Sequence, residues 1–159
     1  MSAGHEIHVA GEHLAVADGR RVDCLLALLK QYQRDNHMAM IFVSHDLGTV
    51  AGLADEIAVM YAGRIVERGP AAEVLAAPRM PYTEGLLRSI PRLDAPSHGR
   101  LEAIRGRPPV PTALPSGCAF RARCPYARER CAEETPLPGT GAHVYACWYP
   151  RPVLDRTEE

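Results

Sequence analysis

The fold is decided by "IFVSHDLGTVAGLADEIAVMYAGRIVERG", residues 41–69. The run "AMIFVS" (39–44), which overlaps its start, is short, apolar and rich in strand formers, the pattern of a strand buried on both faces of a parallel sheet. "DLGTVAGLAD" (46–55) predicts a helix with Asp46 near its start. "EIAVMYAGRIVERG" (56–69) predicts a hairpin that turns at Ala62-Gly63. Strand, helix and hairpin in this order indicate an α/β fold.

Helices are predicted on both sides of this stretch. "VDCLLALLKQYQRD" (22–35) has apolar residues at helical spacing and Lys30, Gln33 and Arg34 on the other side, which indicates an amphipathic helix. "PAAEVLAAP" (70–78) and "PYTEGLLRSI" (81–90) each begin with a proline, a residue that suits the first turn of a helix.

Composition limits the possible functions. The 159 residues are 47% hydrophobic, enough for one globular domain or a small domain with an appendage. The net charge of -1 gives no general attraction to nucleic acid or to an anionic membrane surface, so we expect no nucleic-acid partner. The sequence shows neither a signal peptide nor an apolar run of membrane-spanning length, and we expect a cytoplasmic protein.

The chain divides into four regions by sequence texture. Residues 1–21 have weak periodicity, and we expect them to be poorly ordered. Residues 22–90 carry the α/β pattern. Residues 91–117 are rich in proline and glycine and predict an extended linker or wrapping arm. Residues 118–150 hold four of the five cysteines in a loop-rich extension.

His45 stands just beyond the predicted strand. In an open α/β sheet, ligands bind beyond the carboxyl ends of the strands, so this is a ligand-facing position. A histidine there can donate a hydrogen bond to a phosphate oxygen in its neutral or its charged form. The alternative is a histidine that caps the helix or satisfies local backbone groups, and position alone leaves both interpretations open.

These residues carry a family resemblance. "MIFVSHDLGTVAGLADEIAVMYAGRIVERGPAAEVLAAPRMPYTEGLLRSIP" resembles the C-terminal part of the ATP-binding subunits of oligopeptide and dipeptide ATP-binding-cassette (ABC) importers. The resemblance, which also takes in "IRGRPP" and the cysteine segment, implies the C-terminal part of a P-loop NTPase cassette. It implies that Ser44 and His45 form the switch loop, in which the histidine acts in catalysis by contacting the γ-phosphate of ATP.

The resemblance also implies a location and partners. Asp18, in "VADGRR", stands where the family has the aspartate of "SALD" and becomes a second candidate nucleotide contact. Such subunits work with integral-membrane permease subunits and a second ATP-binding subunit, on the inner face of the cell membrane. ATP with Mg²⁺ is the implied cofactor.

Several parts of an ATPase are missing from the sequence. It contains no G-x-x-x-x-G-K-[ST], no recognisable signature motif and no hydrophobic strand ending in Asp-Glu. Phosphoryl transfer depends on positioning and charge stabilisation, so we expect that this chain alone does not hydrolyse ATP. Two functions remain open: a truncated ATP-binding subunit of a peptide importer, or a non-catalytic, free-standing metal-binding or regulatory module left from one.

Four cysteines in the extension, Cys118, Cys124, Cys131 and Cys147, form a candidate metal site. Four thiolates suit structural zinc or an iron–sulfur cluster, and the gaps are wider than those of paired zinc knuckles. Three closely spaced cysteines with one distant fourth favour a cubane cluster. The family resemblance implies the same [4Fe-4S] cofactor, with zinc as the alternative.

Other residues near these cysteines have plainer predicted roles. Cys24 is predicted to be a small buried hydrophobe, and His143 a surface histidine instead of a substitute ligand. Trp148 and Tyr149 are expected to cover the metal centre, and Tyr82 to pack against the hairpin. Four arginines lie between the cysteines, where they offset thiolate charge or form a solvated basic face: Arg121, Arg123, Arg128 and Arg130.

Overall fold

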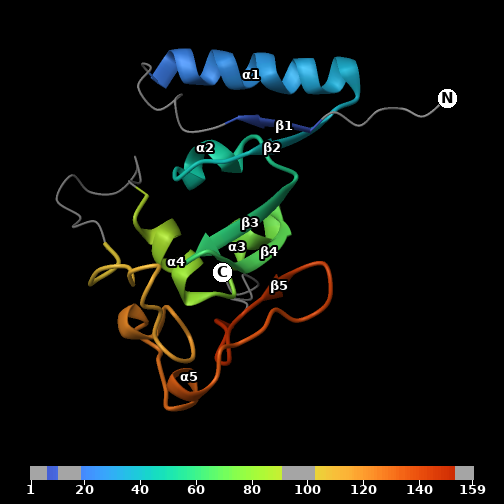
Figure 1. Cartoon of the computed structure of the whole chain (residues 1–159). Coiled ribbons are helices and arrows are strands. Elements are labelled where there is room, and N and C mark those ends of the chain that lie inside the picture. The colour runs from blue at the N-terminus through green and yellow to red at the C-terminus, as the bar shows by residue number, and fades with distance from the viewer. Residues whose placement is uncertain (1–6, 11–18, 91–102, 153–159) are drawn as a thin grey trace, which may run out of the picture. The chain divides into compact units, whose positions relative to one another are not determined.

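The computed structural model describes residues 7–10, 19–90 and 103–152. The chain divides into two compact units, with the boundary in the sequence between Ala54 and Asp55. The first holds elements β1 to α2 and the second holds β3 to β5 (Figure 1). No described helix is long and apolar enough to cross a membrane.

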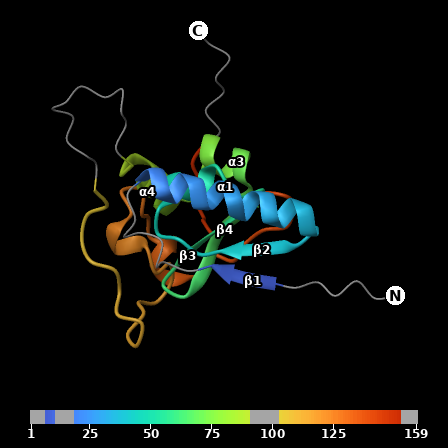
Figure 2. The ribbon, with the colours of Figure 1, turned by 90° about the horizontal axis from the view of Figure 1, so that it is seen from above.

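The first unit is a parallel strand pair with a helix on each face. Strand β1 (Ile7–Ala10) pairs in parallel with β2 (Ala39–Phe42). Helix α1 (Gly19–Asn36) lies along one face of this pair, and the short helix α2 (Leu47–Ala51) lies on the other (Figures 1 and 2). Helix α1 ends at Asn36, and the next residue, His37, has a φ of 50°, the left-handed conformation that commonly terminates a helix.

Two expectations about the strands of this unit need correction. Ile7–Ala10 is a strand, although we expected residues 1–21 to be poorly ordered, because its pairing with β2 supplies hydrogen bonds that periodicity does not reveal. Strand β2 was predicted to be buried on both faces, yet Ile41 is 51% exposed. The described pair has only two strands, so β2 is an edge strand and not an inner strand of a wider parallel sheet.

The side chains of α1 are arranged differently from the predicted pattern. Among the side chains of the helix from Cys24 onward, the partly covered ones are those of Leu26, Leu29, Lys30 and Gln33, at spacings of three and four residues. Cys24 precedes Leu26 by two positions, which turns its side chain away from theirs, so it is exposed and the prediction of a buried cysteine was wrong. Lys30 is partly covered, and its Nζ donates a hydrogen bond to the carbonyl of Gly52 at 3.0 Å.

The second unit is built on an antiparallel sheet in the order β3–β4–β5. The predicted hairpin is confirmed: β3 (Glu56–Tyr61) and β4 (Arg64–Pro70) are joined by Ala62-Gly63. Both turn residues have positive φ, 49° and 77°, as a type I′ turn requires. The two-residue strand β5 (Val144–Tyr145) pairs with the other edge of β4.

Short helices surround this sheet. Helices α3 (Ala71–Ala76) and α4 (Pro81–Arg88) confirm the two predicted helices that begin with proline, although Pro70 is the N-cap of α3 and not part of its first turn. The cysteine segment adds a 3-10 helix, η2 (Arg121–Arg123), and one helical turn, α5 (Arg130–Glu133). Residues 103–117 contain no helix or strand.

The centre of the second unit is a cluster of three aromatic rings. Tyr61 from β3, Tyr82 from α4 and Phe120 from the cysteine segment have ring centroids 4.6 to 5.3 Å apart. The contact of Tyr82 with Tyr61 confirms the predicted packing of α4 on the hairpin. Arg123 donates hydrogen bonds to the carbonyls of Ile104 and Arg105, which fixes the described part of the proline-rich stretch on the cysteine segment.

Candidate functional site

The loop after β2 holds the candidate phosphate contacts. Strand β2 ends at Phe42, so His45 stands three residues past it and not one, and its side chain is exposed. Asp46 caps α2: its Oδ1 accepts a hydrogen bond from the amide of Gly48 at 2.9 Å. The Ser44 hydroxyl accepts one from the amide of Asp46 at 3.0 Å. The hydrogen bonds of Ser44 and Asp46 therefore hold the loop and leave His45 exposed beside them.

The third predicted nucleotide contact, Asp18, lies outside the described residues. The structure therefore places Ser44 and His45 together on one loop and does not relate Asp18 to them. The catalytic and ATP-binding roles of the three residues remain predictions that rest on the family resemblance.

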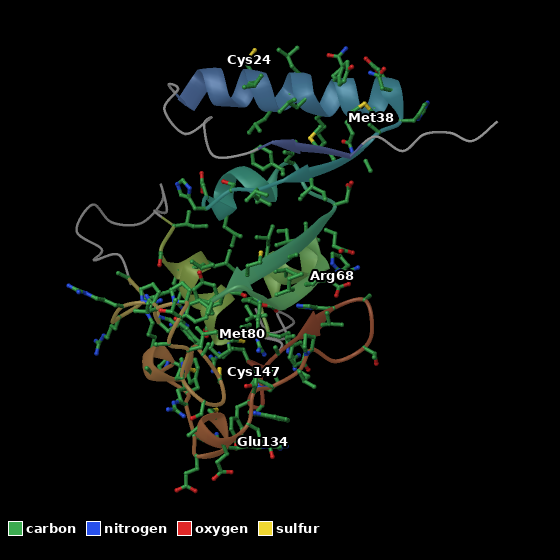
Figure 3. The ribbon with its side chains drawn as sticks, in the orientation of Figure 1. Cys24, Met38, Arg68, Met80, Glu134 and Cys147 are labelled. Atoms are coloured by element: carbon green, nitrogen blue, oxygen red, sulfur yellow. The ribbon has the colours of Figure 1, made fainter. Side chains whose placement is uncertain are left out.

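The four predicted metal ligands line one cavity in the second unit, which we call the cysteine chamber. Its volume is about 10 Å³, roughly room for one water molecule. Figure 3 labels Met80 and Cys147, two of its residues. The chamber is lined by Met80, Pro81, Cys118, Phe120, Arg121, Cys124, Tyr126, Cys131, Pro136, Cys147, Trp148 and Tyr149.

Local backbone structure brings the first and third cysteines together. The amide of Cys118 donates a hydrogen bond to the carbonyl of Cys131 at 2.8 Å. Gly117 precedes it with a φ of 69°, and a Cβ at this position would lie 2.8 Å from the carbonyl carbon and oxygen of Ala132. Glycine is needed here both for the left-handed backbone and for the close approach of α5.

Burial dominates the chemistry of the chamber thiols. It raises the pKa of Cys118 and Cys124 above the usual value, and it raises the pKa of Cys147 to about 11. The neighbouring thiols raise these pKa values further, because like charges would be brought together. In a metal-free protein, these three thiols therefore favour the protonated form.

Backbone amides act in the opposite direction. The amide of Phe120 interacts with Cys118, that of Tyr126 with Cys124 and that of Tyr149 with Cys147, and each lowers the pKa of its thiol. In all three cases the amide comes two residues after the cysteine. Such amides stabilise thiolate once a cation supplies the remaining charge.

The thiols do not converge as a set for one ion. Among the described residues, no group of three or more His, Cys, Asp or Glu side chains is close enough to hold a single metal ion. All five cysteines of the chain are free thiols.

His143 is not one of the residues that line the chamber, and it is not the surface histidine that we predicted. Its side chain is 14% exposed, and its Nε2 is 2.8 Å from the carboxylate of Glu67. The sequence pattern missed Glu67, since two consecutive residues of β4, Val66 and Glu67, are both buried and the expected alternation fails.

Two of the four arginines between the cysteines, Arg128 and Arg130, are exposed, and both also contact aromatic rings. Arg130 lies 3.6 Å above the centre of the Trp148 ring, and Arg128 lies 4.4 Å above that of Tyr149. Arg121 donates a hydrogen bond to the carbonyl of Ala132 at 3.0 Å. Trp148 and Tyr149 line the chamber, so Arg128 and Arg130 support its aromatic wall by cation–π contacts from the solvent side.

Comparison with known proteins connects both sites to one family. Residues 66–131 match the family model described as "Oligopeptide/dipeptide transporter, C-terminal region". The chain is 50% identical over 125 residues to a putative peptide import ATP-binding protein of Brucella ovis, covering 75% of this chain and 37% of that protein.

Two further relatives are also similar to most of this chain and are matched over less than half of their own length. The chain is 42% identical over 127 residues to the oligopeptide transport ATP-binding protein OppD of Salmonella typhimurium, covering 79% of this chain and 38% of OppD. It is 38% identical over 160 residues to OppD of Bacillus subtilis, covering 99% of this chain and 45% of that protein. The chain thus spans less than half the length of these relatives.

Proposed function

Because the chain belongs to the family of C-terminal portions of oligopeptide and dipeptide importer ATP-binding subunits, we propose that it serves ATP-driven peptide uptake. The observation that carries the proposal is its identity of 38% to 50% with peptide import ATP-binding proteins over most of its length. Its partners in this role are membrane permease subunits and a second ATP-binding subunit, which hold it at the inner face of the cell membrane.

In this proposal the two units have different tasks. His45 contacts the γ-phosphate of ATP from its exposed position on the loop that Ser44 and Asp46 hold. The sequence contains no glycine-rich phosphate loop and no Mg²⁺ ligand that we recognise, so ATP binding and hydrolysis need residues that it does not include.

The cysteine chamber is proposed to hold a [4Fe-4S] cluster. Zinc bound to four thiolates at about 2.3 Å would bring the sulfurs to within about 3.8 Å of one another. The four thiols line one cavity, which supports a shared cofactor there, and the cavity of about 10 Å³ would have to widen to admit a cluster. Cys118, Cys124, Cys131 and Cys147 would hold it, and amides two residues on from three of them would stabilise the thiolates. The cluster would stabilise the loop-rich segment.

Peptide uptake tests the transport role. Residues 25–150 of this chain are joined to the N-terminal part of Salmonella typhimurium OppD, in a strain that lacks that subunit, and import of a labelled tripeptide is measured. We expect import that is lost in His45→Ala. A stable chimera that imports no peptide, or a His45→Ala chimera as active as the parent, would contradict the proposal.

Anaerobic reconstitution with iron and sulfide tests the cofactor. We expect a brown protein with absorption at roughly 400 nm, from thiolate-to-iron charge transfer. Cys147→Ser should lose this colour, whereas Cys24→Ser should keep it, because Cys24 is exposed on α1 and does not line the chamber. A colourless protein that retains one zinc ion would contradict the cluster and show that the site binds zinc.

A further inference from the structure

We infer that Glu67 and His143 form a latch that positions Cys147 in the cysteine chamber. The inference rests on the proposed role of the chamber as a cofactor site. It assigns a positioning role to a buried carboxylate and a histidine that lie outside the chamber itself.

Glu67 is the most deeply buried acidic side chain among the described residues. The residue is 1% exposed, and its side chain is fully buried. Its Oε1 accepts hydrogen bonds from the amide of Arg79 at 2.6 Å and from Nε2 of His143 at 2.8 Å. Its Oε2 accepts one from the amide of Met80 at 3.2 Å. A carboxylate has only acceptors, so His143 donates from Nε2.

These three hydrogen bonds join two walls of the chamber. Met80 lines the chamber on one side. His143 stands immediately before β5, and Cys147 stands two residues past its end. Glu67 therefore connects the segment that supplies Met80 with the segment that supplies the fourth thiol.

Strand β5 needs this support because its own pairing is short. It has two residues, which pair with Glu67 and Arg68 of β4, and the amide of Ala146 donates one further hydrogen bond to the carbonyl of Val66. A two-residue strand at the end of a long loop has little stability of its own. The buried side-chain bond of His143 fixes the start of this segment.

The surface of β4 is shaped to receive His143. A Cβ on Gly69 would lie 3.1 Å from both Cα and Cδ2 of His143. Glu67 and Gly69 are two residues apart on β4 and face the same side of the sheet. One supplies the acceptor and the other supplies the space. The second imidazole nitrogen, Nδ1, is 3.7 Å from the carboxylate of Glu73, which is half exposed.

Two of the other chamber thiols, Cys118 and Cys131, have an anchor of their own. Cys118 is bonded through its amide to Cys131, and Gly117 permits their close approach. Loss of the latch should therefore release Cys147 and leave Cys118 and Cys131 in place. This selectivity distinguishes a positioning role from a general contribution to stability.

The test is alkylation of each thiol in the metal-free, reduced, full-length chain, followed by mass spectrometry. Glu67→Gln replaces one acceptor oxygen by an NH₂ group, a donor, which then faces the donor N–H of a backbone amide, so one hydrogen bond is lost. We expect it, and His143→Ala, to raise the alkylation rate of Cys147 about tenfold, the factor that a lost hydrogen bond to a charged group allows. The rates of Cys118 and Cys131 should stay within about twofold of wild type.

Two variants serve as controls. Glu56→Gln makes the same chemical change on β3, where the carboxylate is half exposed and paired with Arg68, and should leave all the rates unchanged. His143→Gln retains a donor near the Nε2 position and should restore most of the protection of Cys147. An unchanged Cys147 rate in Glu67→Gln, or an equal rise at all four thiols, would overturn the latch.

Reconstitution separates this inference from the proposed cofactor. If the wild-type chain takes up an iron–sulfur cluster, Glu67→Gln should lose iron to a chelator about tenfold faster than Glu56→Gln, and equal rates would contradict the latch. If the wild-type chain takes up no cluster, the cofactor proposal fails, and the alkylation rates still decide the role of the latch.

Discussion

Removal of the Phe120 ring should lower the free energy of unfolding of the second unit more than a substitution at an exposed position of the same segment. Phe120 is 2% exposed and contacts both Tyr61 and Tyr82, with ring centroids 5.3 Å away. Replacing a buried phenylalanine by alanine leaves a cavity and costs about 3–5 kcal/mol. With an m-value of about 1.5 kcal/mol/M, Phe120→Ala should lower the urea midpoint by about 2–3 M.

Trp148 is the only tryptophan of the chain and lies in the chamber wall, so its fluorescence reports on this unit. Leu137→Ala is the matched control, because Leu137 is 76% exposed in the same segment and should cost less than about 0.5 kcal/mol. If the urea midpoint of Phe120→Ala lies within about 0.5 M of the wild-type midpoint, a shift like that of the control, then the ring does not join the hairpin to the cysteine segment.

Two further predictions concern the chamber directly. Gly117→Ala should lower the urea midpoint several times more than Gly63→Ala. Both glycines have positive φ, 69° and 77° respectively, but of the two only Gly117 has neighbouring atoms that a Cβ would meet. Equal shifts would show that the backbone conformation alone matters. Burial raises the pKa of Cys147 to about 11, above its usual 9.0, so the metal-free fold holds this proton more strongly than the unfolded chain. The stability that this proton contributes is fully present below pH 9.0 and is lost as the pH rises through about 11. The free energy of unfolding in urea should therefore fall over this pH range, and it should fall less in Cys147→Ser. Identical pH profiles for the two proteins would contradict this.

The sequence predicted elements well where one local signal was sufficient. Ala62-Gly63 between two apolar strands predicts a tight turn, and positive φ at both residues bears this out. Asp46 before an apolar run predicts a helix start, and its side chain caps α2. These features depend on neighbouring residues, so a local pattern contains the necessary information.

Predictions that needed tertiary contacts were less accurate. Cys24 was expected to be buried because leucines surround it in the sequence, yet its side chain is exposed while that of Leu26 is partly covered. Glu67 gave no signal, since a glutamate in a strand normally faces solvent and its partners lie 12 or more residues away. The same limit applies to His143, whose burial depends on the space above Gly69.

The contacts of the hairpin explain why the fourth cysteine can stand so far from the other three. Closing a loop between Cys131 and Cys147 costs conformational entropy that a single metal–thiolate bond would have to offset alone. Strand β4 reduces this cost, because it binds the chain at Tyr145 through pairing and at His143 through Glu67 before Cys147 is reached. The hairpin is thus part of the cysteine site, and variants in β4 should change thiol exposure in the chamber without touching a cysteine.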